Sequence, residues 1–322
     1  MSTTQLIYLV FGAVLALALF LDLGLLSKKH AVVTWKLALT QTVFWILLSL
    51  SFCAFIWYEN NGGNGKTDAI RYISAYLLEW SLSIDNIFVF IIIFSYFKVP
   101  EDNYSRVLLL GILMAIVFRI IFITVGSSLV ARFDWIMYIF GIFLLITGIK
   151  LFSQSEESEF NPGTSWAFRF MKKFFRTTDA EPNGRFFLKI NNKTYLTKLA
   201  MVVIMLGLID ILFAIDSIPA VFSIIPNPQD KLLIYSSNIF AVLGLRSLFF
   251  LLKGASSKFD YLQHGIAVVL IFIGAKMLTE KWIHIPVWVS LMVILVCIGS
   301  SVLYSVFKNQ EEKDTEVLNK EN

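Results

Sequence analysis

Two short stretches of the sequence place acidic side chains inside long apolar runs. The first, EWSLSIDNIFVF, covers residues 79–90, and the second, DILFAIDSIPAVF, covers residues 210–222. Each holds two acids six residues apart, and in each the second acid sits in the pattern Ile-Asp-(Asn/Ser)-Ile. An acid at the centre of a membrane helix costs about 2.5–3.5 kcal/mol, so such residues usually mark functional sites. We therefore expect the two stretches to form one polar site inside a membrane.

The polar groups of these stretches are carboxylates, one amide and one hydroxyl. The predicted metal ligands are Glu79, Asp85, Asn86, Asp210, Asp216 and Ser217. Ligation by oxygen alone suits Mg²⁺, Ca²⁺ and Mn²⁺, and no His or Cys accompanies these residues. The same carboxylates could relay protons, and exchange of a proton for a metal would couple two fluxes. As a structural alternative, Arg119 and Arg246, which also lie in apolar runs, could neutralise acids as buried pairs.

Helix geometry predicts which of these side chains share a face. Residues seven apart align on a helix, so Glu79 lies on the same face as Asn86. Asp210 is aligned with Ser217 in the same way. Asp85 and Asp216 point elsewhere on a regular helix. They either serve other partners or are gathered by local unwinding, for which Pro219 is a candidate.

Composition places the whole chain in a membrane. Of 322 residues, 57% are hydrophobic and 16% are charged, whereas a soluble domain carries about a quarter charged residues. Apolar runs of about 20 residues recur, each long enough to cross a bilayer. We predict an all-α polytopic protein whose residues 1–308 form a single transmembrane domain. The nine predicted spans cover residues 5–26, 37–58, 70–97, 105–129, 134–152, 196–225, 231–252, 260–279 and 285–307.

Basic residues predict the orientation of the spans. With the loops assigned alternately to two sides, one side holds 19 Lys and Arg and the other holds six. Cytoplasmic loops carry the excess of positive charge, so the N-terminus is predicted to be periplasmic and the C-terminus cytoplasmic. The two cysteines fall in apolar segments, and we expect no disulfide.

The two acidic stretches each begin a longer repeat. After the first come Arg119, Phe133-Asp134 and TGIK, and after the second come Arg246, Phe259-Asp260 and IGAK. Repeat A covers about 70–152 and repeat B about 196–279, with three predicted spans in each. Because three is odd, the second copy enters from the opposite side, so the repeats are inverted. Inverted repeats are typical of secondary transporters with a substrate site near the membrane midplane.

Two segments lie outside the predicted spans. The cytoplasmic loop at about 153–195 contains WAFRFMKKFFR, residues 166–176, which is predicted to be an amphipathic helix on the bilayer. A hairpin is predicted around Asn191-Asn192, and the loop leaves room for protein partners. The tail, residues 309–322, lacks apolar periodicity and is predicted to be disordered.

The motifs resemble those of the TerC family of integral membrane proteins. The matching segments are EWSLSIDNIFVF, FDWIMYIFGIFLLITGIK, FAIDSIPAVF, NIFAVLGLRSLFFLL and GIAVVLIFIGAKML. The resemblance implies a nine-span protein of the bacterial inner membrane that exports Mn²⁺ through a site on its two acidic helices. It assigns to that site the same six residues named above. One departure is Gly207, where the family commonly has a further acid.

We predict a secondary transporter that exports Mn²⁺, in exchange for protons, with no fixed cofactor and no enzymatic activity. Two alternatives are a proton-coupled exporter of another small cation and a membrane scaffold that supplies metal to translocated proteins. An intramembrane aspartyl hydrolase is disfavoured because the chain has no Gly-x-Gly-Asp signature. The expected partners are Mn²⁺, protons and the lipid bilayer, with no nucleic acid.

Overall fold

The structure, a computed structural model, covers most of the chain. It describes residues 3–25, 33–59, 65–133, 135–153, 162–178, 184–190, 192–227, 230–253, 262–283 and 285–321. The backbones of Asp85 and Asp216 lie in helices, but their side chains fall outside the described part of the structure.

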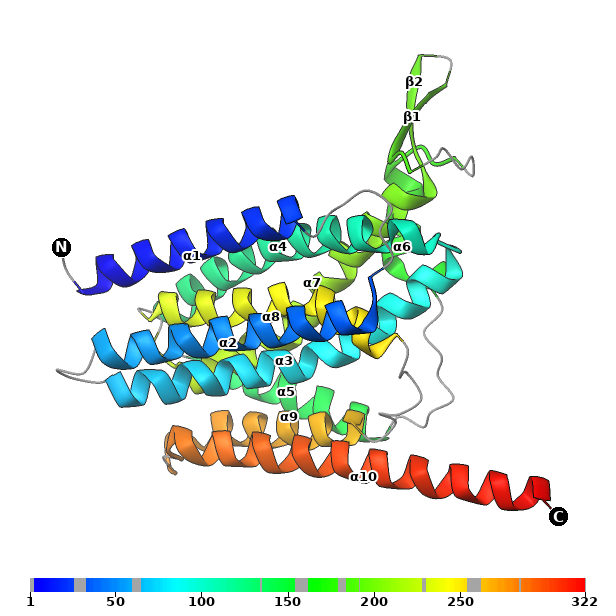
Figure 1. Cartoon of the computed structure of the whole chain (residues 1–322). Helices are drawn as coiled ribbons and strands as arrows, with labels where there is room; N and C mark the ends of the chain where they lie inside the picture. The colour runs from blue at the N-terminus through cyan, green and yellow to red at the C-terminus, as the bar shows by residue number, and fades with distance from the viewer. Residues whose placement is uncertain are drawn as a thin grey trace.

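Long helices run side by side along one axis and form the body of the molecule (Figure 1). They are α1 (Thr3–Leu25), α2 (Trp35–Glu59), α3 (Gly65–Tyr96), α4 (Tyr104–Arg132), α5 (Ile136–Ser153), α7 (Lys198–Ile224), α8 (Lys231–Leu252), α9 (Leu262–Thr279) and α10 (Val287–Glu321). Among the described residues, seven helices are long and apolar enough to cross a membrane, and residues 5–18 and 264–279 form shorter apolar helices. The all-α membrane class is confirmed, while the count of nine spans stays a prediction.

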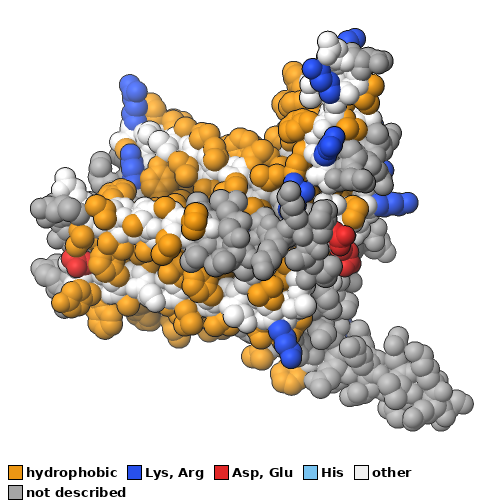
Figure 2. All heavy atoms as spheres, turned by 45° about the horizontal axis from the view of Figure 1, so that its top comes forward, with side chains coloured by type: hydrophobic (Ala, Val, Ile, Leu, Met, Phe, Trp, Pro, Cys, Tyr) orange, Lys and Arg blue, Asp and Glu red, His pale blue; other side chains and the backbone are white. Residues whose placement is uncertain are grey.

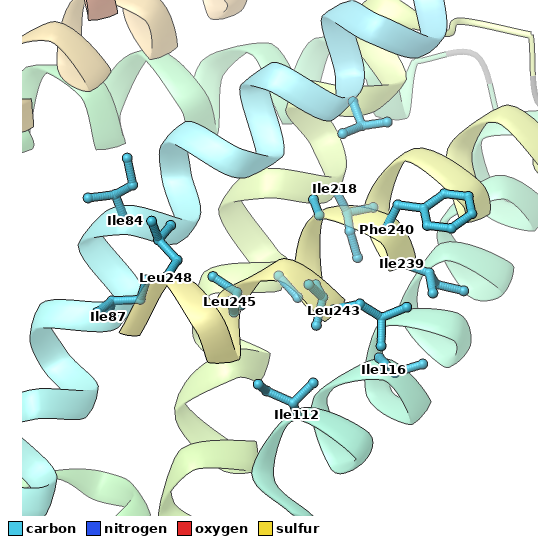
Figure 3. Packing of buried hydrophobic residues seen from close by; sticks show 14 of the residues in the cluster. Ile84, Ile87, Ile112, Ile116, Ile218, Ile239, Phe240, Leu243, Leu245 and Leu248 are labelled. Carbon is cyan, nitrogen blue, oxygen red and sulfur yellow. The ribbon is translucent and has the colours of Figure 1, made fainter. Parts of the chain in front are cut away.

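Helix α8 lies at the centre of the bundle. Its apolar stretch is 94% buried, against 33% for α2 and 17% for the apolar part of α10. Leu248 of α8 lies beside Ile84 and Ile87 of α3 (Figure 3), and Phe240 of α8 packs on Phe52 of α2. Apolar side chains also cover the outer sides of the bundle, while most of the visible charged side chains gather at its ends (Figure 2). The outer helices therefore present the surface that lipid would cover.

Contacts between the two predicted repeats are reciprocal. Helices α3, α4 and α5 of repeat A correspond to α7, α8 and α9 of repeat B. Helix α3 packs on α8, its counterpart α7 packs on α4, and α5 packs on α9. Exchange of the repeats reproduces this set of contacts, which is the pattern that an inverted repeat predicts.

The α5–α9 contact is reciprocal at the level of single residues. A Cβ atom on Gly274 would lie 2.7 Å from the carbonyl oxygen of Gly141, and one on Gly148 would lie 2.9 Å from that of Ala267. In the repeat alignment Gly148 corresponds to Gly274, and Gly141 corresponds to Ala267. Each of the two contacts is therefore the repeat equivalent of the other. Small residues at these positions let the backbones of two membrane helices approach closely.

A small subdomain lies at the end of the bundle where α4 and α7 begin. The predicted amphipathic segment holds α6 (Trp166–Phe174), whose N-cap Ser165 accepts a hydrogen bond from the backbone N–H of Phe168. Two short 3₁₀ helices, η1 (Glu101–Asn103) and η2 (Pro162–Thr164), lie in the connections. The predicted hairpin is formed by β1 (Phe187–Ile190) and β2 (Lys193–Leu196), which pair antiparallel. Asn192 in its turn has φ of 60°, a conformation that Asn tolerates better than most residues.

Helix α10 corrects the prediction that residues 309–322 are disordered, because it continues to Glu321. The prediction rested on the lack of apolar periodicity. A helix that has already formed its first turns extends without a further nucleation cost. The segment also contains four Glu and two Lys, which favour helix, and Glu316 precedes Lys320 at a favourable spacing of four.

The α5–α9 contact should not tolerate a side chain at Gly274. We expect Gly274→Ala to lower the free energy of unfolding in detergent by about 1–3 kcal/mol, because its Cβ would press on backbone atoms of α5. The control is Gly299→Ala in α10, where no atom lies within 4 Å of the new Cβ. Thermal unfolding of both variants checks this, and equal stability of the two would contradict it.

Candidate functional site

The guanidinium of Arg119 in α4 holds an acid from each of the two acidic helices. Its Nε and Nη2 atoms donate to Oδ2 and Oδ1 of Asp210 in α7, both at 3.0 Å. Its Nη1 atom donates to Oε1 of Glu79 in α3. The same Nη1 atom lies 3.4 Å from Oδ1 of Asn238 in α8. One side chain therefore connects four helices of the bundle.

This network is closed to solvent. Arg119, Glu79, Asp210 and Asn238 are all 0% exposed. A bidentate pairing of Arg with a carboxylate is among the stronger polar contacts, and low dielectric strengthens it further. Two carboxylates nevertheless face one guanidinium, so the group carries one excess negative charge when both acids are ionised. A buried charge of this kind is relieved by a proton or by another cation.

Further buried polar atoms lie on the helices that carry the network. Within the described residues, the hydroxyls of Ser83 and Ser127 have no hydrogen-bond partner, while the hydroxyl of Ser217 in α7 lies beside the carboxylate of Glu79 in α3. A buried polar group left unpaired costs about 1–3 kcal/mol. Ser83 is one turn beyond Glu79 on α3, and Ser217 is two turns beyond Asp210 on α7. Polar oxygen atoms therefore continue from the network along both acidic helices.

The structure places the predicted ligands as follows. Glu79 and Asp210 are brought together around Arg119. Asn86 and Ser217, predicted to share their faces, are buried like them, at 3% and 1% exposure. Asp85 and Asp216 cannot be placed, since their side chains lie outside the described residues. No group of three or more His, Cys, Asp or Glu side chains in the described part of the chain could hold a metal. The six-residue metal site stays a prediction.

The structural alternative from the sequence is confirmed for one arginine: Arg119 neutralises Glu79 and Asp210. Its repeat counterpart, Arg246, is also buried, in α8. Asn238 forms a helix–helix contact to Arg119, and its Nδ2 atom donates to the carbonyl oxygen of Ile234 at 3.0 Å.

Pro219 does not end its helix. Helix α7 runs from Lys198 to Ile224 with Pro219 inside it. Because proline has no N–H, the carbonyl oxygen of Ile215 lacks its usual helical donor. This oxygen immediately precedes Asp216 in the chain, so it adds a hard, uncharged acceptor next to the second acidic motif.

Gly207, where the sequence departs from the family that it resembles, lies against Met114 of α4. A Cβ atom on Gly207 would lie 1.9 Å from Cε of Met114 and 3.1 Å from its Sδ atom. The methionine side chain therefore fills the space that a side chain at position 207 would take. Glycine at position 207 therefore goes together with methionine at position 114, a relation that the sequence alone did not reveal.

Sequence reasoning missed the role of Lys276, the last residue of the second repeat motif. Its side chain is buried, and Nζ donates to the carbonyl oxygen of Ser223 at 3.3 Å and to Oγ of Ser290 at 3.1 Å. It borders two hollows, of about 480 and 260 Å³, at the end of the bundle opposite the hairpin. Its repeat counterpart Lys150 is exposed. The sequence did contain one sign of this, because Lys276 is a charged residue in the last turn of an apolar helix.

The fold and the buried network define a polytopic helical membrane protein with an ion-pair network in its core. The chain belongs to the integral membrane protein TerC family, whose sequence profile matches residues 64–313.

Similar proteins cover almost the full chain. It is 41% identical over 311 residues to "Putative membrane-bound redox modulator Alx" of Escherichia coli (strain K12), covering 95% of this chain and 96% of that protein. A membrane protein of Myxococcus xanthus is 41% identical over 300 residues, with 93% and 92% covered. One of Rickettsia felis is 38% identical over 301 residues, with 94% and 97% covered. No solved structure matches the chain.

Removing the guanidinium should destabilise the bundle. We expect Arg119→Met to lower the free energy of unfolding by about 3–5 kcal/mol, because two buried carboxylates lose their counter-charge. The triple variant that also carries Glu79→Gln and Asp210→Asn should recover much of this loss, since no buried charge remains in the network. Thermal unfolding in detergent measures both effects.

A matched control lies on the same helix. Arg132 is exposed in the last turn of α4, and Arg132→Met should leave the unfolding temperature unchanged. If Arg119→Met were as stable as Arg132→Met, the ion-pair network would not support the fold.

Proposed function

We propose that this protein exports Mn²⁺ across the bacterial inner membrane in exchange for protons, using carboxylates of α3 and α7. The observation that carries the proposal is the charge imbalance of the buried network. Glu79 and Asp210 share the single guanidinium of Arg119, with all three side chains closed to solvent. An excess carboxylate in such a place favours uptake of a proton or a metal cation, which are the two species that an antiporter exchanges.

The chemistry of the proposed ligands favours a hard divalent cation. Glu79, Asp210, Asn86 and Ser217 offer only oxygen and amide groups, and Asp85 and Asp216 would add two carboxylates. The carbonyl oxygen that Pro219 leaves without a donor belongs to the same class of ligand. Oxygen-only ligation accommodates Mn²⁺ and disfavours softer metals such as copper.

Arg119 has a defined part in this proposal. Its guanidinium occupies the position of a counter-cation between the two acidic helices. We assign this arrangement to the cation-free state, in which Arg119 holds the carboxylates in place. Binding of the metal then requires the carboxylates to exchange the guanidinium for Mn²⁺. Such an exchange keeps the buried charge compensated throughout, which lowers the cost of moving between states.

The packing of the repeats supports alternating access. The contacts of α3 with α8, of α4 with α7 and of α5 with α9 are reciprocal. Rocking of one repeat against the other would then open the site to each side in turn. In the proposed orientation the N-terminus is periplasmic, and the end that carries the hairpin is cytoplasmic. We also propose that the cytoplasmic loop at about 153–195 can bind protein partners.

Two alternatives predict different results. An exporter of another small cation would use the same carboxylates but would not respond to manganese. A scaffold that supplies metal to translocated proteins would bind metal without a flux. The redox role in the name of the Escherichia coli relative has little support here as thiol chemistry, because Cys53 and Cys297 lie in separate helices and are not paired. No feature of the buried network favours an enzyme.

Manganese export can be tested in cells loaded with Mn²⁺. Cells that make the wild-type protein should contain less manganese than cells without it. Cells that make Asp85→Asn or Glu79→Gln should retain as much manganese as cells without the protein, because a carboxylate of the site is lost. Mass spectrometry of total cell metal, over a panel of divalent ions, gives the measurement.

The control is Asp102→Asn, which neutralises an exposed acid in η1 and should export normally. Equal manganese in wild-type and Asp85→Asn cells would refute export of this ion. In proteoliposomes with a pH-sensitive dye inside, a Mn²⁺ gradient should drive protons the opposite way. Metal binding without such a flux would favour the scaffold.

A further inference from the structure

The subdomain at one end of the bundle forms a surface that the transport proposal does not use. We call it the basic arm, and define it as residues 162–178, 184–190 and 192–198, which include α6, β1 and β2. In Figure 1 the hairpin of the arm projects sideways, across the direction of the long helices, rather than onward along their axis. The arm is attached where α4 and α7 begin, so its level is that of a membrane surface beside the bundle.

The basic arm carries a strong excess of positive charge. Its described segments contain eight Lys and Arg and no Asp or Glu, and the five residues that follow residue 178 add Asp179 and Glu181. Seven of their basic residues are exposed: Arg169, Lys172, Lys173, Arg176, Arg185, Lys189 and Lys193. A surface with such an excess of positive charge attracts an anionic partner and gains little from a neutral one.

Large apolar side chains are exposed on the same arm. Phe174 is 63% exposed and Phe187 is 62% exposed. Trp166, Phe170, Phe175 and Ile190 are exposed as well. Figure 2 shows apolar and basic side chains next to each other along the arm. Aromatic residues mixed with Lys and Arg are typical of segments that lie at the boundary between lipid headgroups and acyl chains.

The base of the arm is fixed to the bundle. The backbone N–H of Leu196 donates to the carbonyl oxygen of Arg176 at 2.8 Å, joining the hairpin to the segment after α6. Thr197, the N-cap of α7, donates from its hydroxyl to the carbonyl oxygen of Arg185 at 2.8 Å. Arg106 of α4 donates to the carbonyl oxygen of Gly184 and lies over the ring of Phe186. These contacts hold the arm in its sideways direction.

We propose that the basic arm is a binding element for anionic phospholipid, which lies on the leaflet beside the bundle and inserts its exposed apolar side chains there. The position of the arm at the membrane surface, its positive charge and its exposed apolar side chains all favour an anionic phospholipid as the partner. A soluble acidic protein would satisfy the charge, but would leave unexplained why the arm extends sideways at the level of the membrane surface. The proposal is independent of manganese transport.

Depth measurements test the inserted side chain directly. The full-length protein, with Cys53→Ser and Cys297→Ser, carries one spin label at Ile190→Cys and is reconstituted into nanodiscs. In discs that contain phosphatidylglycerol, the label should be accessible to oxygen and shielded from a water-soluble nickel complex. A label at Asp102→Cys, at the same end of the bundle but outside the arm, should stay accessible to nickel. If the label at Ile190 is as accessible to nickel as the one at position 102, the proposal is wrong.

Charge variants test the lipid preference. Lys172→Gln with Lys173→Gln should weaken binding of phosphatidylglycerol, relative to phosphatidylcholine, by about tenfold or more, because each base near an anionic surface contributes about 1 kcal/mol. Native mass spectrometry of the purified protein with both lipids provides the ratio. The matched control is Lys66→Gln with Lys281→Gln, two exposed lysines outside the arm. An equal loss in both double variants would overturn the assignment to the arm.

Discussion

One buried guanidinium determines how the central helices of this protein fit together. Lipid tails are as apolar as the helices they surround, so membrane helices associate through close packing and polar contacts rather than through the hydrophobic effect. Arg119 supplies such contacts to α3, α7 and α8 at once. Its two carboxylate partners are stable in a dry core only because it is there. The ion-pair network that joins the central helices is therefore also the group whose charge is incompletely balanced. The same side chains support the fold and carry the proposed function.

The network is less symmetric than the sequence that encodes it. Glu79 and Asp210 are equivalent positions of the two repeats, yet both contact the arginine of the first repeat. Arg246, the equivalent of Arg119, is buried further along α8. The proposed rocking between the repeats requires such a difference, since each single state of an alternating-access transporter is asymmetric. Exchange of the conformations of the two halves would carry the acids from one arginine toward the other.

Much of this arrangement could be predicted from residue patterns, and the remainder depends on packing. Apolar runs revealed the membrane helices, and spacing of seven placed Glu79 with Asn86 on one buried face. Periodicity gives the face of a helix but not the neighbour that it meets, so the sharing of Arg119 by two helices could not be derived. The Met114 contact with Gly207 is of the same kind, because it joins residues 93 positions apart in sequence. The helical tail was missed because continuation of a helix needs no apolar pattern.

The burial of α8 has a consequence for how the protein is made. Of the seven helices in the described residues that are long and apolar enough to span the membrane, it is the least apolar, and it carries Arg246, Asn238 and three buried serines. Such a segment would partition poorly into lipid by itself. Its main packing partners, α2, α3 and α4, all precede it in the chain and leave the ribosome earlier. Newly synthesised α8 can thus enter a prepared protein groove instead of bare bilayer, so the order of synthesis matches the order in which the helices can be accommodated.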